Sequence, residues 1–243
     1  MNLLESQWLG EKLASIPDSQ LFPLLNVGSS TLEFRTQTQP YIDSQIFAPL
    51  RRRGGTVYHL DMKPDPGVDL VGDLLDASFR NSIRKLTIRS AMVSNLLEHV
   101  TNREEICETL LDVIPEGGHV IVSGPSRYPY HADPIDTMFR PSIDEVAHLF
   151  PGTHIVESAI VDSGNWRQWN VAERGRPLSQ SLLRLMVPFY RPKKWLELAR
   201  QSPYIFKHIQ AFAVVLRKGP ASFAPNIQPA RRPAPSAAAR VAS

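Results

Sequence analysis

The chain has very little cysteine, with Cys107 alone among 243 residues. A single cysteine cannot form a disulfide within the chain. Cys107 lies in the helix-like stretch NREEICETLLDVI, a context that favours a small buried side chain over a reactive nucleophile. We therefore expect no disulfide framework and no thiol chemistry.

Long hydrophobic runs are also missing. No run approaches the roughly 18 apolar residues that a membrane-spanning helix needs. The first residues, MNLLESQWLGEKL, are acidic and amphipathic, whereas a secretory signal is basic and then apolar. We expect a cytoplasmic protein.

Acidic residues are scarce in the last third of the chain. Lys and Arg against Asp and Glu number 13 and 22 over residues 1–164, 11 and 2 over 165–218, and 3 and 0 over 219–243. The regional charges of −9, +9 and +3 sum to the overall +3. The sequence pI of about 9.1 therefore reflects one segment. A whole-protein argument for binding nucleic acid fails, and no nucleic-acid partner is expected.

The domain organisation follows from composition. Residues 219–243 are built from Pro, Ala and Ser with three Arg, so they cannot offset their ordering entropy by burial and are predicted to be disordered. Residues 1–218, in a chain that is 42% hydrophobic, are predicted to form one domain. Within it, the basic, aromatic stretch 165–205 is interpreted as an insertion or lid.

Apolar strand-like runs alternate with helical patterns ahead of the tail. The runs are PLLNVG, GGTVYHLDM, VDLVGDLLD, IRSAMVSNLLEHV, GGHVIVSGP, THIVESAIVDS and FKHIQAFAVVLRK. Between the fourth and fifth, apolar residues from Ile106 to Ile114 have helical spacing and end at Pro and Gly-Gly. This alternation predicts an α/β fold with an open, mostly parallel seven-stranded sheet covered by helices.

The first turn, in LLNVGSSTLEFR, is short of glycine. Gly28 lets the backbone turn tightly, but serines stand where a dinucleotide fold needs further glycines around a pyrophosphate. Asp61 also follows Gly28 by 33 residues, against roughly 20 in that fold. Both features argue against a nicotinamide-dependent enzyme. A nucleoside ligand without phosphate needs fewer glycines.

Polar residues follow the strand-like runs, where parallel sheets bind ligands. Asp61 follows the second run and can accept hydrogen bonds from two ribose hydroxyls. Asp73 follows the third and can accept from an exocyclic amine, and Asn95, Glu98 and His99 follow the fourth. Each has a structural alternative, because Asp commonly caps helices and turns and a histidine can simply pack.

On these residues the chain resembles the class I S-adenosylmethionine-dependent methyltransferases, and in particular the type 11 branch found among bacterial glycan-biosynthesis enzymes. The resemblance runs from about Leu24 to Lys218. It rests on LNVGSSTLEFR, YHLDMKPDPGVDLVGDLLD, VSNLLEHVTNREEICETLLDVIPEGGHVIVSGPSRYPYHADPIDTMFRPS and the closing IQAFAVVLRK. It implies a Rossmann-like methyltransferase fold with an antiparallel last strand.

The resemblance also implies an S-adenosyl-L-methionine site. The loop approaches the methionine part of the cofactor, Asp61 and Met62 lie at the ribose, and Asp73 with Leu74 lies along the adenine. Asn95 and Leu96 line the sulfonium side. The loop residues are Val27, Gly28, Ser29 and Ser30.

A general base is required only if the methyl acceptor is a hydroxyl. The candidates are His99 and, in YPYHADPIDTMFRP, His131 with Asp133 as its orienting carboxylate; Asp136 and Arg140 lie in the same stretch. The alternative is a structured loop whose His131 hydrogen-bonds the backbone. No metal ion is expected.

The predicted function is O-methylation of a sugar or other small polar metabolite. Aromatic and basic residues over 180–195 suit a peripheral contact with an anionic membrane, although a plain substrate lid explains them equally well. The alternative function is a methyltransferase-like module that has lost catalysis and serves binding or assembly. The sequence does not indicate the oligomeric state.

Overall fold

The computed structural model describes residues 1–131, 135–165, 195 and 207–220. Its described residues contain a seven-stranded sheet in the order β3-β2-β1-β4-β5-β7-β6. The strands are β1 (Leu24–Val27), β2 (Val57–Asp61), β3 (Leu70–Val71), β4 (Ser90–Ser94), β5 (His119–Arg127), β6 (Thr153–Asn165) and β7 (His208–Lys218). Each of the seven predicted runs contains one strand.

Strands β1 to β5 pair in parallel, whereas β7 is antiparallel to both β5 and β6. The predicted mostly parallel sheet with an antiparallel last strand is confirmed. Chain order reverses at β1, which pairs with β2 on one side and β4 on the other. The carboxyl ends beside that reversal are where such sheets bind ligands.

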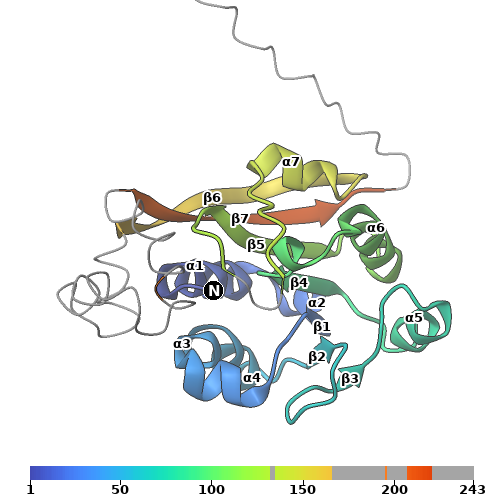
Figure 1. The fold of residues 1–243 in the computed structure, drawn as a ribbon. Coiled ribbons are helices and arrows are strands. Elements are labelled where there is room, and N and C mark those ends of the chain that lie inside the picture. The colour runs from blue at the N-terminus through green and yellow to red at the C-terminus, as the bar shows by residue number, and fades with distance from the viewer. Residues whose placement is uncertain (132–134, 166–194, 196–206, 221–243) are drawn as a thin grey trace, which may run out of the picture.

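Helices cover both faces of the sheet, as Figure 1 shows with α1, α3 and α4 on one side and α5 and α6 on the other. The α-helices are α1 (Leu3–Ser15), α2 (Asp18–Leu21), α3 (Pro40–Ile42), α4 (Ala48–Arg52), α5 (Ala77–Arg84), α6 (Arg103–Val113) and α7 (Ile143–His148). Two π-helical turns, Phe34–Thr38 and Asp43–Phe47, complete the crossover after β1.

Two apolar cores hold these layers together. On one face, Leu9 and Leu13 of α1 pack with Met92 of β4, Ile121 of β5 and Val215 of β7. On the other, the helices α5, α6 and α7 cover the opposite sides of the same strands. Strands buried on both faces read as continuous apolar runs, which explains why the sequence located them.

Helix α6 is the helix predicted from the Ile106–Ile114 spacing. Its Cys107 is buried, and this burial raises the pKa of the thiol to about 12. A thiol that stays protonated is a poor nucleophile. The interpretation of Cys107 as a packing residue is confirmed.

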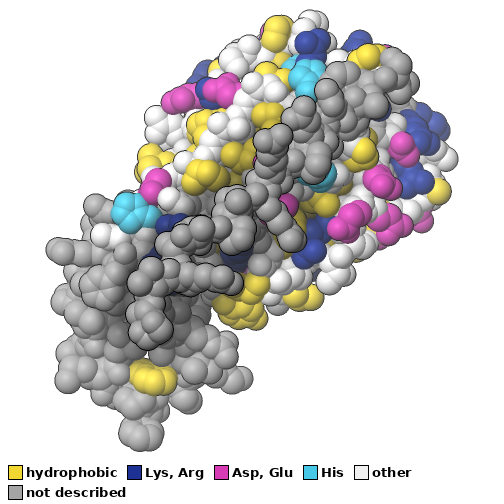
Figure 2. Space-filling view, turned by 90° about the horizontal axis from the view of Figure 1, so that it is seen from above, with side chains coloured by type: hydrophobic (Ala, Val, Ile, Leu, Met, Phe, Trp, Pro, Cys, Tyr) yellow, Lys and Arg dark blue, Asp and Glu magenta, His cyan; other side chains and the backbone are white. Residues whose placement is uncertain are grey.

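The sheet ends on one side at β6, whose outer surface is exposed along most of its length. Seen from above, the molecule exposes hydrophobic side chains among charged ones (Figure 2). Ile155, Val156 and Ile160 of β6 are exposed hydrophobic residues. Among the described residues, no helix combines the length and apolar character needed to cross a membrane.

Candidate cofactor and acceptor site

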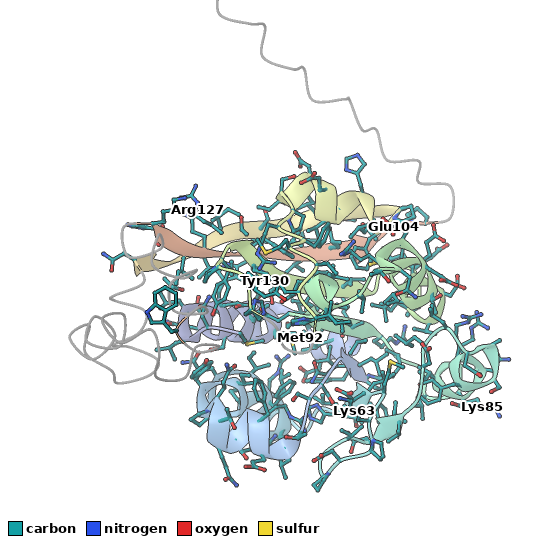
Figure 3. The ribbon with its side chains drawn as sticks, viewed as in Figure 1. Lys63, Lys85, Met92, Glu104, Arg127 and Tyr130 are labelled. Atoms are coloured by element: carbon teal, nitrogen blue, oxygen red, sulfur yellow. The ribbon has the colours of Figure 1, made fainter. Side chains whose placement is uncertain are left out.

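The carboxyl ends of β1 to β5 lie along one edge of the sheet and bring together the residues singled out in the sequence. In Figure 3, Lys63 marks the chain just after β2, Met92 the middle of β4 and Tyr130 the segment after β5. The edge divides into two halves. The β1–β3 half carries the loop after β1 with Asp61 and Asp73, and the β4–β5 half carries Glu98, His99 and His131.

The loop after β1 has two residues in the left-handed region. Gly28 has φ of +68° and Ser30 has φ of +54°. A Cβ on Gly28 would lie 3.0 Å from Leu96 Cδ1, so glycine is required there both for its backbone conformation and for the close approach of Leu96. Val27 and Ser29 are buried.

Arg35 holds this loop in place through hydrogen bonds to backbone carbonyl oxygens. Its guanidinium Nη1 donates to the carbonyl oxygens of Ser29 at 2.8 Å and Ser30 at 2.7 Å, and its Nη2 donates to Gly67 O at 2.7 Å. The residue is 3% exposed, and burial lowers the pKa of its guanidinium. One buried arginine therefore orders a loop that has serines in place of glycines. Sequence analysis missed this residue.

Asp61 lies at the end of β2, directly opposite the loop. Its Oδ2 accepts from the backbone N–H of Ser30 at 2.9 Å, and its Oδ1 accepts from the N–H of Lys63 at 3.3 Å. Each carboxylate oxygen has two lone-pair sites. Both oxygens thus keep acceptor capacity, which is what a pair of ribose hydroxyls requires.

Asp73 lies just beyond β3, which pairs with β2 so that Asp61 is opposite Val71. The Asp73 Oδ1 accepts from Leu75 N at 2.9 Å, which is the turn-forming role that sequence analysis weighed as the alternative. Its other oxygen makes no hydrogen bond within the described residues. Leu74 is buried, and Met62 is 68% exposed.

Asn95 follows β4 with φ of +50°. Its side-chain N–H donates to Glu5 Oε1 at 2.8 Å, and that oxygen also accepts from Ser123 Oγ at 2.7 Å. Glu5 is 1% exposed and belongs to the capping box at the start of α1 with Asn2. These hydrogen bonds hold α1 against the carboxyl ends of β4 and β5. Nothing local in the sequence indicates this role for Glu5.

Glu98 is not at the open mouth of the site but buried, with 1% of the residue exposed. Its Oε1 has no hydrogen-bond partner among the described residues. Burial raises the pKa of this carboxyl group. A buried carboxylate oxygen without a hydrogen-bond partner costs folding free energy. The Glu98 oxygen therefore indicates that a group outside the described residues binds there.

His99 and His131 lie beside Glu98. Their ring centroids are 5.3 Å apart and nearly perpendicular, and His99 Nε2 lies 3.8 Å from Glu98 Oε1. The Nδ1 of His99 contacts the carbonyl oxygen of Ile135. Because a carbonyl only accepts, Nδ1 carries the proton, and the Nε2 lone pair of neutral His99 remains available.

His131 lies beside Asp136, and its ring Nδ1 is buried without a hydrogen-bond partner among the described residues. Its backbone N–H donates to Asp136 Oδ2 at 3.0 Å, and its ring Nδ1 lies 3.2 Å from the same oxygen. Arg140 binds both Asp136 oxygens, at 3.1 and 2.7 Å. Although burial alone raises it, hydrogen bonds from Arg140 and from the backbone of His131 and Met138 lower the pKa of Asp136 to about 2. The carboxylate stays charged.

Burial lowers the pKa of His131, more than the neighbouring Asp136 raises it. A histidine that is neutral near pH 7 can accept a proton. Asp133, the carboxylate predicted to orient His131, lies outside the described residues. Asp136 occupies a position suited to that task.

No protein-family model matches the sequence, and no curated protein matches it either. A solved structure of a candidate sarcosine dimethylglycine methyltransferase from Galdieria sulphuraria is similar, with a TM-score of 0.50 and 12% identity over 88% of this chain and 85% of that chain. Coclaurine N-methyltransferase, solved with N-methylheliamine and S-adenosylhomocysteine, has a TM-score of 0.48 and 16% identity over 89% of this chain and 72% of that chain.

At 12% identity the likeness to the Galdieria sulphuraria structure concerns the fold alone. The strand order β3-β2-β1-β4-β5-β7-β6 agrees with it. The chain has the class I methyltransferase fold, with mixed strand directions at the β5-β7-β6 end of the sheet.

Proposed function

We propose that the protein is an S-adenosyl-L-methionine-dependent methyltransferase that acts on an oxygen of a small polar molecule. The observation that carries the proposal is Asp61, whose carboxylate faces the ordered Gly28–Ser30 loop and keeps acceptor capacity on both oxygens. A nucleoside ribose placed there has two hydroxyl donors for these acceptors.

The loop itself supports a ligand without phosphate. A pyrophosphate site presents several backbone N–H groups at a helix N-terminus. Here the N–H of Ser30 is taken by Asp61, and the N–H of Ser29 donates to Leu60 O at 2.9 Å. Two donors that a pyrophosphate would use are already occupied.

The β4–β5 half supplies the groups that an oxygen acceptor needs. Methyl transfer is an in-line displacement, and alignment of donor and acceptor provides much of the acceleration. His131, or His99 beside it, removes the acceptor proton, and Asp136 Oδ2 lies 3.2 Å from Nδ1 of His131. Buried carboxylates of Glu5 and Glu98 at this edge favour the positive sulfonium of the cofactor.

The finer acceptor class, a sugar within glycan assembly, is proposed from the sequence resemblance. Sequence analysis interpreted the basic stretch 180–195 as a lid or a peripheral membrane contact. Residues 180–194 of it lie outside the described residues, as does the tail from residue 221. Cytoplasmic localisation likewise stays a prediction.

The test is methyl transfer from methyl-labelled S-adenosylmethionine to a mixture of polar small molecules from a bacterial extract. We expect a labelled product that survives treatment with base, because base cleaves a methyl ester but spares the methyl ether that forms on a hydroxyl. The His131→Ala variant should lower turnover while its affinity for S-adenosylhomocysteine stays unchanged. Cofactor binding without any labelled product would favour the inactive binding module instead.

A further inference from the structure

We propose that Glu98, His99 and His131 bind a single divalent transition-metal ion, and that Zn²⁺ is the ion their ligand set fits best. The three side chains come from the turn after β4 and from the segment after β5. Each offers one ligand atom, and these atoms all lie within 4.8 Å of one another.

The spacing is close to that of a formed site. Bonds of about 2.0 to 2.1 Å at tetrahedral angles place ligand atoms roughly 3.3 Å apart. Glu98 Oε1 and His99 Nε2 are 3.8 Å apart without an ion. The whole set lies within 4.8 Å, so the ligand atoms must approach one another by at most about 1.5 Å to bind one ion.

The His99 ring is held as metal-binding histidines are, and the His131 ring has a carboxylate close by. A metal-binding ring usually directs its second nitrogen to a carboxylate or a backbone carbonyl, which fixes its orientation. His99 contacts Ile135 O through Nδ1, and His131 has Nδ1 3.2 Å from Asp136 Oδ2. In His99, Nε2 is the nitrogen left for an ion, whereas in His131 the buried Nδ1 makes no hydrogen bond among the described residues and itself lacks a partner.

Glu98 supplies an independent observation. Its carboxyl group is 1% exposed, and Oε1 has no hydrogen-bond partner in the part of the chain that the structure describes. Buried charges in proteins are paired or coordinate metals. An ion at this position would satisfy the orphaned oxygen.

Two imidazoles and one carboxylate select against the hard cations. Mg²⁺ and Ca²⁺ prefer all-oxygen ligand sets, whereas two histidines with one glutamate are a known zinc combination that leaves a coordination position open. Three protein ligands would leave a fourth position open at the β4–β5 half of the edge. If the proposed function holds, the acceptor oxygen can occupy it, where the ion would lower its pKa. The ion would then take the place of the histidine base, because a ring nitrogen bound to the ion cannot accept a proton.

The experiment is a calorimetric titration of the tag-free, chelator-treated full chain with Zn²⁺ alone, without S-adenosylmethionine. We expect one ion per chain. The variants His99→Ala and His131→Ala should each weaken binding by about 10- to 100-fold or more. His148→Ala, which removes an exposed histidine of α7, is the matched control and should bind like the unmodified chain.

Substitution with Co²⁺ gives a second readout that needs no variant. A Co²⁺ ion held by two nitrogens and a carboxylate in four-coordinate geometry absorbs strongly in the visible range, and a weakly absorbing six-coordinate spectrum would overturn the proposal. So would sub-stoichiometric zinc binding, or binding that His148→Ala weakens as much as His131→Ala. Glu98→Gln, checked for folding by thermal melting, should also lose the ion.

Failure of the metal proposal can be distinguished from failure of the proposed function. Metal binding is measured without the cofactor, and titration of S-adenosylhomocysteine into the same histidine variants measures the β1–β3 half alone. Zinc binding with no cofactor binding would keep this inference and remove the proposed function, and the opposite result would do the reverse.

Discussion

The two halves of the carboxyl edge differ in how their polar groups are satisfied. In the β1–β3 half, Asp61, Arg35 and the loop carbonyls are joined by hydrogen bonds that fix the backbone. In the β4–β5 half, Glu98 is buried with an orphaned oxygen, and two imidazoles lie beside it. A preorganised surface suits recognition of one invariant ligand, whereas incompletely paired groups suit chemistry on an incoming one.

The largest expected effect comes from removing the arginine that orders the first half. Arg35→Met should lower the free energy of unfolding by about 3 kcal/mol, because three carbonyl oxygens lose a charged donor. It should also weaken cofactor binding. Chemical denaturation with urea measures the stability.

Arg51→Met is the control for that experiment. Its guanidinium pairs with Asp43 at 2.8 Å, but the side chain is 55% exposed, and an exposed pair is worth about 0 to 1 kcal/mol. Equal losses in the two variants would show that the loop does not depend on Arg35.

Asp61→Ala tests recognition more than stability. We expect S-adenosylhomocysteine affinity to fall about 100-fold, which is about 2.7 kcal/mol, because two ribose hydroxyls lose a charged acceptor. Equilibrium dialysis measures the affinity. Asp112→Ala, on the surface of α6 where Asp112 lies 3.6 Å from Arg84, should leave it unchanged, and similar affinities for both variants would remove Asp61 from the site.

Gly28→Ala tests whether the loop after β1 depends on its close contact with Leu96. The alanine must adopt φ of +68°, and its Cβ would lie 3.0 Å from Leu96 Cδ1. Together these should lower the free energy of unfolding by about 1 to 2 kcal/mol. Gly54→Ala has φ of +75° with nothing within 4 Å of the Cβ, so it measures the backbone cost alone. A larger loss for Gly54→Ala would contradict the packing argument.

A smaller effect is expected from pH. Burial, with a contribution from Arg35, lowers the pKa of His59 to about 4, and its Nδ1 lies 3.0 Å from Asn26 Nδ2. The unfolded chain binds this proton near pH 6.5 and the folded chain near 4. Stability is therefore present above pH 6.5 and is lost as pH falls from there toward 4, by about 1 kcal/mol between pH 7 and 5.5.

Thermal melts across that range measure the loss. His59→Gln should reduce the slope without abolishing it, because burial also lowers the pKa of His119 and His131. A slope unchanged in the variant would show that His59 does not carry this dependence.

The inner strands were predictable because strands buried on both faces read as apolar runs. The placement of Asp61 and Asp73 at the sheet edge was predictable because they end or follow such runs. Arg35 was not, since its contact with Gly67 spans 32 positions along the chain and no local pattern marks it. Glu5 contacts Ser123 across 118 positions. The burial of Glu98 depends in the same way on packing between distant elements.

The most direct test of the account is calorimetric titration of the unmodified full chain with S-adenosylhomocysteine, with NAD titrated in parallel. The account predicts saturable binding of one S-adenosylhomocysteine per chain at micromolar concentration and no comparable binding of NAD. Absence of S-adenosylhomocysteine binding up to millimolar concentration, or tighter binding of NAD, would contradict it.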